Sequence, residues 1–260
     1  MYVPVLVYHK ISRALDLSVT RVPPRRFNRQ IRHLHHRGYR ALTVSEFVRQ
    51  RSPSTQHKKH VLVTFDDACA SVYHEALPIL ARFGFNATVF VITDYVGRNG
   101  GWDYPLSARG GHCDWEQLQT LATHGWEIGS HTRSHRSLRH LSPTQVRSEL
   151  CDSRRLLEDR LGQPVRVVAF PFGQYDQGVL DCAWEAGYHA ACTLSGPHIE
   201  NAYGALRLLA RRGVYWFDPL FFFKLKLTAH PFEDYKQKAI SFCANGTILL
   251  QRLRELKINA

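Results

Sequence analysis

Short apolar runs alternate with longer amphipathic segments along most of this chain. The apolar runs predict strands at residues 3–8, 61–65, 87–92, 126–129, 165–170, 189–193 and 213–216. Helical spacing of apolar positions, bounded by capping residues, glycine or proline, predicts helices at 24–37, 44–51, 71–83, 115–124, 142–161 and 177–186. Repeated strand–helix units are typical of a mainly parallel sheet covered by helices, which either closes into a barrel or stays open as a doubly wound sheet.

The positions of the polar motifs favour the barrel. Asp66 and Asp67 directly follow one predicted strand, His131 follows another, and a Pro-Phe-Gly turn at 171–173 follows a third. A (β/α) barrel brings the carboxyl ends of all its strands to one mouth, where active sites are built. We therefore predict one α/β domain over residues 1–260, a distorted (β/α) barrel with its site at this end.

Composition narrows the possible classes of protein. The chain has 260 residues with 44% apolar content, enough for a sizeable core, and no apolar run approaches the roughly 20 residues of a membrane span. Met1 is not followed by the basic region and cleavage site of a secretory signal, so we expect a cytoplasmic protein or a mature form. The sequence leaves the oligomeric state open.

The net charge of +12 raises the hypothesis of a nucleic-acid-binding protein. The arginines are dispersed, however, and no RNA-binding signature or helix-turn-helix spacing accompanies them. The charge therefore indicates a basic surface that could attract an anionic polymer or a membrane surface, and we expect no nucleic-acid partner.

The chemistry is concentrated in two stretches. His131 and His135 are four residues apart, so both side chains can point to one side of a turn or short helix. Two imidazoles and one carboxylate can hold a divalent metal with one position open for water, and the second acid is then free to act as a base. The alternatives are that the acids cap the following helix and that the histidines are solvated. The combination favours a metal-dependent hydrolase.

Several motifs, in order along the chain, resemble those of a known family. They are TFDDA at 64–68, HGWEIG at 124–129, SHTRSH at 130–135 and AFPFGQYD at 169–176. Together they look like the polysaccharide deacetylases, carbohydrate esterase family 4, also called the NodB homology domain. The similarity runs from about residue 61 to residue 193. The opening PVLVYHK at 4–10 resembles the branch that deacetylates poly-β-1,6-N-acetylglucosamine, an exopolysaccharide of biofilms.

This resemblance implies a role for each motif residue. Asp67, His131 and His135 would be the metal ligands, and Asp66 would be the general base. The backbone N–H of Phe172 would donate to the developing oxyanion. The donor set suits Zn²⁺ best, with Ni²⁺, Co²⁺ or Fe²⁺ as alternatives.

The general acid departs from the commonest family pattern, which supplies a histidine near the C-terminus. His230 is the nearest candidate there. In the exopolysaccharide branch the order of elements resembles a circular permutation, and the acid follows the first strand, where this chain has His9. We predict His9 as the acid, with a structural histidine as the alternative. The family's arginine before the Pro-Phe-Gly turn is missing, because residues 169–170 are Ala-Phe.

Residues for substrate binding are predicted from aromatic and turn positions. Pyranose faces stack on aromatic rings, so Trp115 and Tyr175 could line a sugar groove with Pro171 and Gly173, as could Trp102 and Tyr104; core packing is the alternative. The run at 220–225 predicts a helix packed on the barrel, and an exposed part of it would form an apolar patch suited to a membrane or partner protein.

The sequence thus predicts a metal-dependent enzyme that removes N-acetyl groups from an N-acetylglucosamine-containing polysaccharide, with exopolysaccharide favoured. The alternatives are a peptidoglycan or chitin deacetylase, an O-acetyl esterase with the same site, and a non-catalytic carbohydrate-binding protein. The pair of adjacent acids argues against the last, because a binding module needs no base beside a metal ligand.

Overall fold

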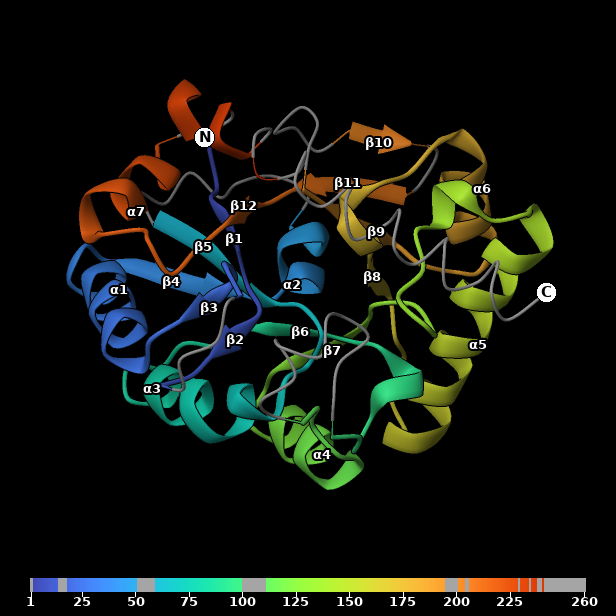
Figure 1. Ribbon diagram of the computed structural model, residues 1–260, viewed down its shortest axis with the longest axis horizontal. Coiled ribbons are helices and arrows are strands. Elements are labelled where there is room, and N and C mark those ends of the chain that lie inside the picture. The colour runs from blue at the N-terminus through green and yellow to red at the C-terminus, as the bar shows by residue number, and fades with distance from the viewer. Residues whose placement is uncertain are drawn as a thin grey trace.

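A parallel sheet curls almost into a closed barrel, with helices around its outside (Figure 1). The computed structural model describes residues 2–13, 18–50, 59–99, 111–194, 201–203, 206–228, 230–233, 235–237 and 240. Trp102 and Tyr104 lie outside these residues. The strands of the ring are, in spatial order, β11 (Leu206–Ala210), β9 (Ala190–Thr193), β8 (Val167–Ala169), β7 (Glu127–Ser130), β6 (Thr88–Val91), β5 (Lys59–Phe65), β1 (Val5–Tyr8) and β12 (Arg212–Gly213). The predicted (β/α) barrel is confirmed.

The ring closes through one continuous segment of the chain. β11 pairs in parallel with β9, and β12 pairs in parallel with β1 on the opposite side of the gap. Only Arg211 separates β11 from β12. The segment therefore changes partner at Arg211 and joins the two edges of the sheet.

Four further strands lie off the ring. β4 (Tyr39–Leu42) pairs with the first half of β5, and β10 (Asn201–Tyr203) pairs antiparallel with β11. β2 (Lys10–Ile11) and β3 (Arg21–Val22) form a separate parallel pair beyond the end of β1.

Alternation along the strands divides the apolar side chains into two clusters. The barrel interior contains Val5, Leu62, Phe90, Val167 and Leu209. The alternate positions pack outward against the helices, which are α1 (Pro24–His36), α3 (Leu77–Ala81), α4 (Trp115–Thr123), α5 (Pro143–Leu161), α6 (Gln177–Glu185) and α7 (Leu220–Lys226). No helix in the described part of the chain is long and apolar enough to cross a membrane.

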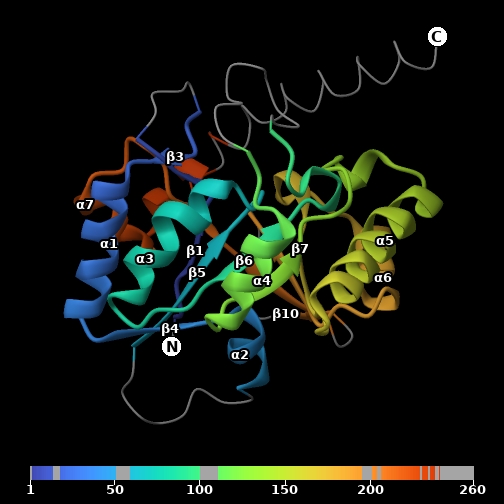
Figure 2. The ribbon, with the colours of Figure 1, turned by 90° about the horizontal axis from the view of Figure 1, so that it is seen from below.

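The short helix α2 (Val44–Arg49) closes one end of the barrel, as Figure 2 shows. It starts with a capping box between Thr43 and Glu46. The backbone N–H of Ser45 donates to the half-buried Glu127 carboxylate, which also accepts from the Thr88 hydroxyl. With this end closed, the interior is accessible from the carboxyl ends of the strands.

Most predicted helix ends are confirmed by their caps. Asp114 and Ser142 each accept the N–H three residues later in a capping box, and Gly162 ends α5 in the left-handed conformation at φ +65°. The predicted helix at 71–83 is divided instead. A π-helix, η1 (Val72–Ala76), precedes α3, and Pro78 lies near the start of α3, where its missing N–H costs least.

The prediction of a strand at 213–216 is wrong. β12 ends at Gly213, although the Val214 N–H still donates to Val7. The chain then turns, and the Asp218 carboxylate accepts the Tyr215 N–H at 3.0 Å. β4 and β11 were not predicted. β4 shows no clean alternation, because its burial is intermediate along most of its length.

Candidate active site

Strand alternation directs four polar side chains into the mouth of the barrel. Asp66 lies four residues after the interior Leu62, His9 lies four after Val5, and Arg211 lies two after Leu209. His131 lies four after Glu127, whose carboxylate bonds to Thr88 in the neighbouring strand. These residues come from four different strands, so the barrel brings them together.

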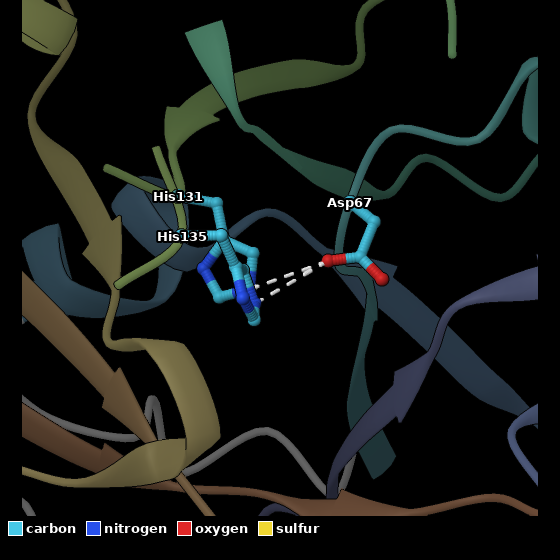
Figure 3. Close-up of side chains that lie close together, drawn as sticks. All are labelled: Asp67, His131 and His135. Atoms are coloured by element: carbon cyan, nitrogen blue, oxygen red, sulfur yellow. Dashed lines mark ion pairs between the residues drawn. The ribbon is translucent and has the colours of Figure 1, made fainter. Parts of the chain in front are cut away.

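Asp67, His131 and His135 form a compact buried group (Figure 3). One potential ligand atom from each residue lies within 4.8 Å of the others. The Asp67 Oδ1 atom is 3.6 Å from His131 Nε2 and 3.7 Å from His135 Nε2. Two imidazole nitrogens and one carboxylate oxygen facing a common point fit a divalent metal ion with further positions open.

Left-handed backbone conformations are concentrated around this group. The non-glycine residues with positive φ in the described chain are Asp67, Ala68, Thr132, His135 and Phe172, with φ between 48° and 66°. Side chains with a Cβ rarely adopt this region, and such strain typically marks functional sites. Asp66 faces inward, so the next residue of a regular strand would face outward. The left-handed turn at Asp67 instead lets the Asp67 side chain also reach the mouth of the barrel.

Hydrogen bonding orients the His131 ring. Its Nδ1 donates to the Ala169 carbonyl at 2.7 Å, which leaves the Nε2 lone pair facing Asp67. Burial lowers the pKa of His131, and it lowers the pKa of His135 well below its ordinary value. Both imidazoles are therefore neutral at neutral pH, the form that binds a metal.

The loop between the two histidines is held by Glu149 from α5, which is 7% exposed. Its carboxylate accepts the backbone N–H groups of Arg133 and Ser134, both at 2.9 Å, and the Ser134 hydroxyl. On the other side, the Asp94 N–H donates to the Arg133 carbonyl at 2.9 Å. The spacing of His131 and His135 thus depends on a carboxylate that touches neither ring.

The Asp67 loop has a matching support. The Nδ1 atom of the buried His112 donates to the Asp67 carbonyl at 2.7 Å. Next to it, the Cys113 N–H donates to the Ala68 carbonyl at 2.8 Å. Neither His112 nor Glu149 could be predicted from the sequence, because supports of this kind show no motif spacing.

Arg211 is the most important site residue that sequence analysis missed. Its fully buried guanidinium binds both oxygens of Asp66, at 2.6 and 2.8 Å, and contacts the Thr64 hydroxyl at 3.2 Å. Burial alone would raise the pKa of Asp66, but Arg211, with His131, outweighs it and lowers this pKa to about 2. The arginine absent before the Pro-Phe-Gly turn thus has a counterpart between β11 and β12. The sequence contained one indirect signal for such a residue. Asp66 follows a strand predicted to be buried, and no cationic residue stands next to it in the sequence, so a partner from elsewhere in the chain was required.

The turn Pro171–Gly173 lies against the histidines. The Phe172 ring packs edge-on against His135, with ring centroids 4.9 Å apart. Gly173 has φ +66°, and a Cβ there would collide with the backbone N of Leu194. Glycine is therefore required at this position, and it keeps the Phe172 backbone against the site.

The two candidate acids lie in different places. His9 interacts electrostatically with Asp66, Arg211, His131 and His135, as expected from its inward position. Burial lowers its pKa to about 4, although the Asp66 carboxylate opposes the shift. His230 is exposed, and its contacts are with Arg212, Phe232 and Glu233. The structure brings His9, and not His230, to the site.

The two aromatic residues predicted to bind substrate make packing contacts. Tyr175 packs against the core and against Phe170, with ring centroids 5.9 Å apart. The Trp115 ring also packs against the core, and the Arg160 guanidinium lies over it at 5.5 Å. These contacts favour the packing alternative for both residues.

A (β/α) barrel with a buried Asp/His/His group at the carboxyl ends of its strands is an architecture suited to a hydrolase with a single-metal site. Residues 54–191, slightly more than half of the chain, match the family Polysaccharide deacetylase, and the chain belongs to this family. Membership supports an enzyme that removes acetyl groups. The match includes Asp66, Asp67, His131 and His135, whereas His9 and Arg211 lie outside it.

Individual relatives agree with this assignment. YxkH of Bacillus subtilis, a protein assigned to the polysaccharide deacetylases, is 34% identical over 73% of this chain and 63% of its own length. A poly-β-1,6-N-acetyl-D-glucosamine N-deacetylase of Staphylococcus aureus is 25% identical over 68% of this chain and 62% of its own length. The matches thus span somewhat less than two thirds of both relatives. The deacetylase PplD of Streptococcus pyogenes, solved in complex with acetate, superposes with a TM-score of 0.73 at 25% identity, covering 87% of this chain and 98% of that one.

Proposed function

We propose that this protein is a metal-dependent N-deacetylase that acts on an N-acetylglucosamine-containing polysaccharide, releasing acetate and leaving free amines. The observation that carries the proposal is the pairing of two acids with different environments. Asp67 faces the two histidines, and Asp66 is held ionised by Arg211. The similarity to a poly-β-1,6-N-acetyl-D-glucosamine N-deacetylase supports an exopolysaccharide as the substrate.

The donor set supports one metal position. His131 Nε2, His135 Nε2 and the Asp67 carboxylate would hold one divalent cation, with Zn²⁺ favoured by the ligand types. When bound, such a cation polarises the acetyl carbonyl and lowers the pKa of water. Asp67 neutralises part of the positive charge, and the support from Glu149 and His112 keeps the ligands in place before binding.

The remaining residues manage the protons. Asp66 accepts a proton from the water that attacks the acetyl carbon, because its low pKa keeps it ionised at neutral pH. The Phe172 N–H donates to the carbonyl oxygen as negative charge develops there. The C–N bond then breaks as His9 donates a proton to the amine nitrogen. With a pKa of about 4, His9 is neutral at neutral pH, so it first takes up the proton that Asp66 removed from the water and then delivers it to the amine.

The test is acetate release from a panel of substrates: β-1,6-linked and β-1,4-linked N-acetylglucosamine oligomers, peptidoglycan fragments and an O-acetylated polysaccharide. We expect release from the β-1,6-linked oligomers, loss of release with a chelator, and recovery on adding Zn²⁺. Asp66→Asn should abolish release with the metal content unchanged, whereas Asp67→Asn should lower the metal content itself. Asp159→Asn, at an exposed position of α5, is the matched control.

Each alternative has its own outcome. Preference for β-1,4-linked oligomers or peptidoglycan would assign a different polymer to the same chemistry, and preference for the O-acetylated substrate would make the protein an esterase. Binding of oligosaccharide without release of acetate from any substrate, with metal bound, would leave a carbohydrate-binding protein and refute the proposal.

A further inference from the structure

Exposed apolar side chains are concentrated on one face of the molecule. Within the described residues, seven large hydrophobic side chains are exposed, and Trp184 on α6 is separate from the other six. The other six lie on or beside α7, and we call them the α7 patch. Its members are Val19, Trp216, Phe217, Phe221, Phe232 and Tyr235.

Direct contacts connect most of the patch. The Trp216 N–H donates to the Val19 carbonyl, and the Trp216 ring packs edge-on against Phe217. Phe222 contacts both Phe221 and Phe232, with ring centroids 5.6 Å apart in each pair. Phe221 is 66% exposed and Tyr235 is 73% exposed. Exposed apolar area that is concentrated in this way typically marks an interaction surface.

A buried ion-pair network fixes the segment that carries the patch. The Lys226 ammonium, which is fully buried, binds the carboxylates of Asp218 and Glu233. Lys236 binds the same two carboxylates and lies over the rings of Phe217 and Phe222. The aromatic side chains are therefore displayed by a segment that ion pairs hold in place, and the rings of Phe221 and Phe232 take no part in these ion pairs.

The exposed charged side chains of the two helices beside the patch, as far as the structure describes them, are basic. α7 packs beside α1, and both views of the ribbon place the two helices together (Figures 1 and 2). α1 exposes Arg25, Arg29 and Arg32, and α7 exposes Lys224. Residues 18–45 and 219–232 contain no aspartate or glutamate. In the segment that carries α7, Asp218 and Glu233 are buried in the ion-pair network, and Asp234, which precedes Tyr235 in the sequence, lies outside the described residues.

We infer that the face formed by the α7 patch and the exposed side of α1 docks on an anionic lipid surface. Aromatic rings partition into the boundary between headgroups and acyl chains, and arginines beside them pair with lipid phosphates. The inference does not depend on the proposed function.

The test is co-sedimentation of the full chain with vesicles. We expect binding to vesicles of equal parts phosphatidylcholine and phosphatidylglycerol, weakening as salt rises, and little binding to phosphatidylcholine alone. The double variant Phe221→Ser/Phe232→Ser should bind at least about tenfold more weakly. Arg25→Gln/Arg29→Gln/Arg32→Gln should lower binding several-fold and flatten its salt dependence.

Two controls distinguish binding through this surface from nonspecific binding to the vesicles. Trp184→Ser removes the exposed ring outside the patch and should bind vesicles as the parent does. Hydrolysis of a soluble activated acetyl ester should be unchanged in the Phe221→Ser/Phe232→Ser variant, since neither ring belongs to the site.

Three results would overturn the inference. They are absence of binding to the anionic vesicles, equal loss of binding in Trp184→Ser, and a dimer in the parent that becomes a monomer in the Phe221→Ser/Phe232→Ser variant. The last would assign the α7 patch to contact between two copies of the chain.

Discussion

Replacing Arg211 with methionine should test how the base is kept ionised. The Arg211–Asp66 pair is bidentate, and both side chains are 3% exposed or less. Removing one member of such a pair leaves an uncompensated buried charge, which costs about 3–5 kcal/mol of stability. We expect Arg211→Met and Asp66→Asn each to lower the free energy of unfolding by this amount. The double variant should cost far less than the sum, with a coupling energy of about 3 kcal/mol.

The pH dependence of the free energy of unfolding tests the same ion pair, and its direction can be predicted. Arg211 holds the pKa of Asp66 at about 2 against an ordinary value of 3.8, a difference equivalent to roughly 2.5 kcal/mol. This contribution is fully present above pH 4 and is lost as the pH falls towards 2. In Arg211→Met only His131 and His9 remain to oppose the effect of burial on this carboxyl, so its pKa rises, and stability should instead decrease as the pH rises through the new value.

The assay is urea unfolding of the metal-free protein in the presence of a chelator, from pH 3 to pH 8. Arg155→Met, an exposed arginine on α5, is the control and should change stability by less than about 0.5 kcal/mol. If the Arg211→Met and Asp66→Asn costs add to within about 0.5 kcal/mol, the two side chains are not coupled, and the account of the base is wrong.

Three further predictions concern the rest of the site. His9→Ala should depress N-deacetylation far more than hydrolysis of an activated acetyl ester, whose leaving group needs no proton, while His230→Ala should leave both rates near the parent; equal effects on both substrates would remove His9 as the acid. Glu149→Ala should weaken Zn²⁺ binding about 10- to 100-fold in a competition titration, with Glu149→Gln intermediate, and unchanged affinity would contradict its positioning role. Gly173→Ala should lower the rate and the thermal midpoint together, because its methyl group meets the Leu194 backbone; a stable, fully active variant would show that the turn can shift.

The metal group could be predicted because its signals are local. Asp67 sits next to an acid that strand alternation directs inward, and His131 and His135 share one short loop. Each of these patterns fits within six residues, so it is visible before the fold is known.

Arg211 could not be found in this way. It pairs with a carboxylate 145 positions earlier, and the strand that precedes it, β11, was not predicted from the sequence. Glu149 and His112 form hydrogen bonds with backbone groups of other loops. Many donor or acceptor side chains can make such bonds, so the sequence does not indicate which residue does. The contacts of Trp115 show the same limit, because an aromatic ring at a helix start has the same pattern whether it binds a sugar or covers a core.

The closing segment of the barrel has a consequence for the order of folding. Val7 pairs with Gly213, so the last edge of the ring joins strands from opposite ends of the motif-bearing chain. Long-range pairing of this kind forms late, after the entropy of a large loop has been overcome. Arg211 arrives with the same segment, so Asp66 gains its counter-charge only when the ring closes. A nascent chain that has not reached residue 213 has neither a complete ring of strands nor the Arg211–Asp66 pair that holds the base in place, so the protein cannot acquire its chemistry before its topology is complete.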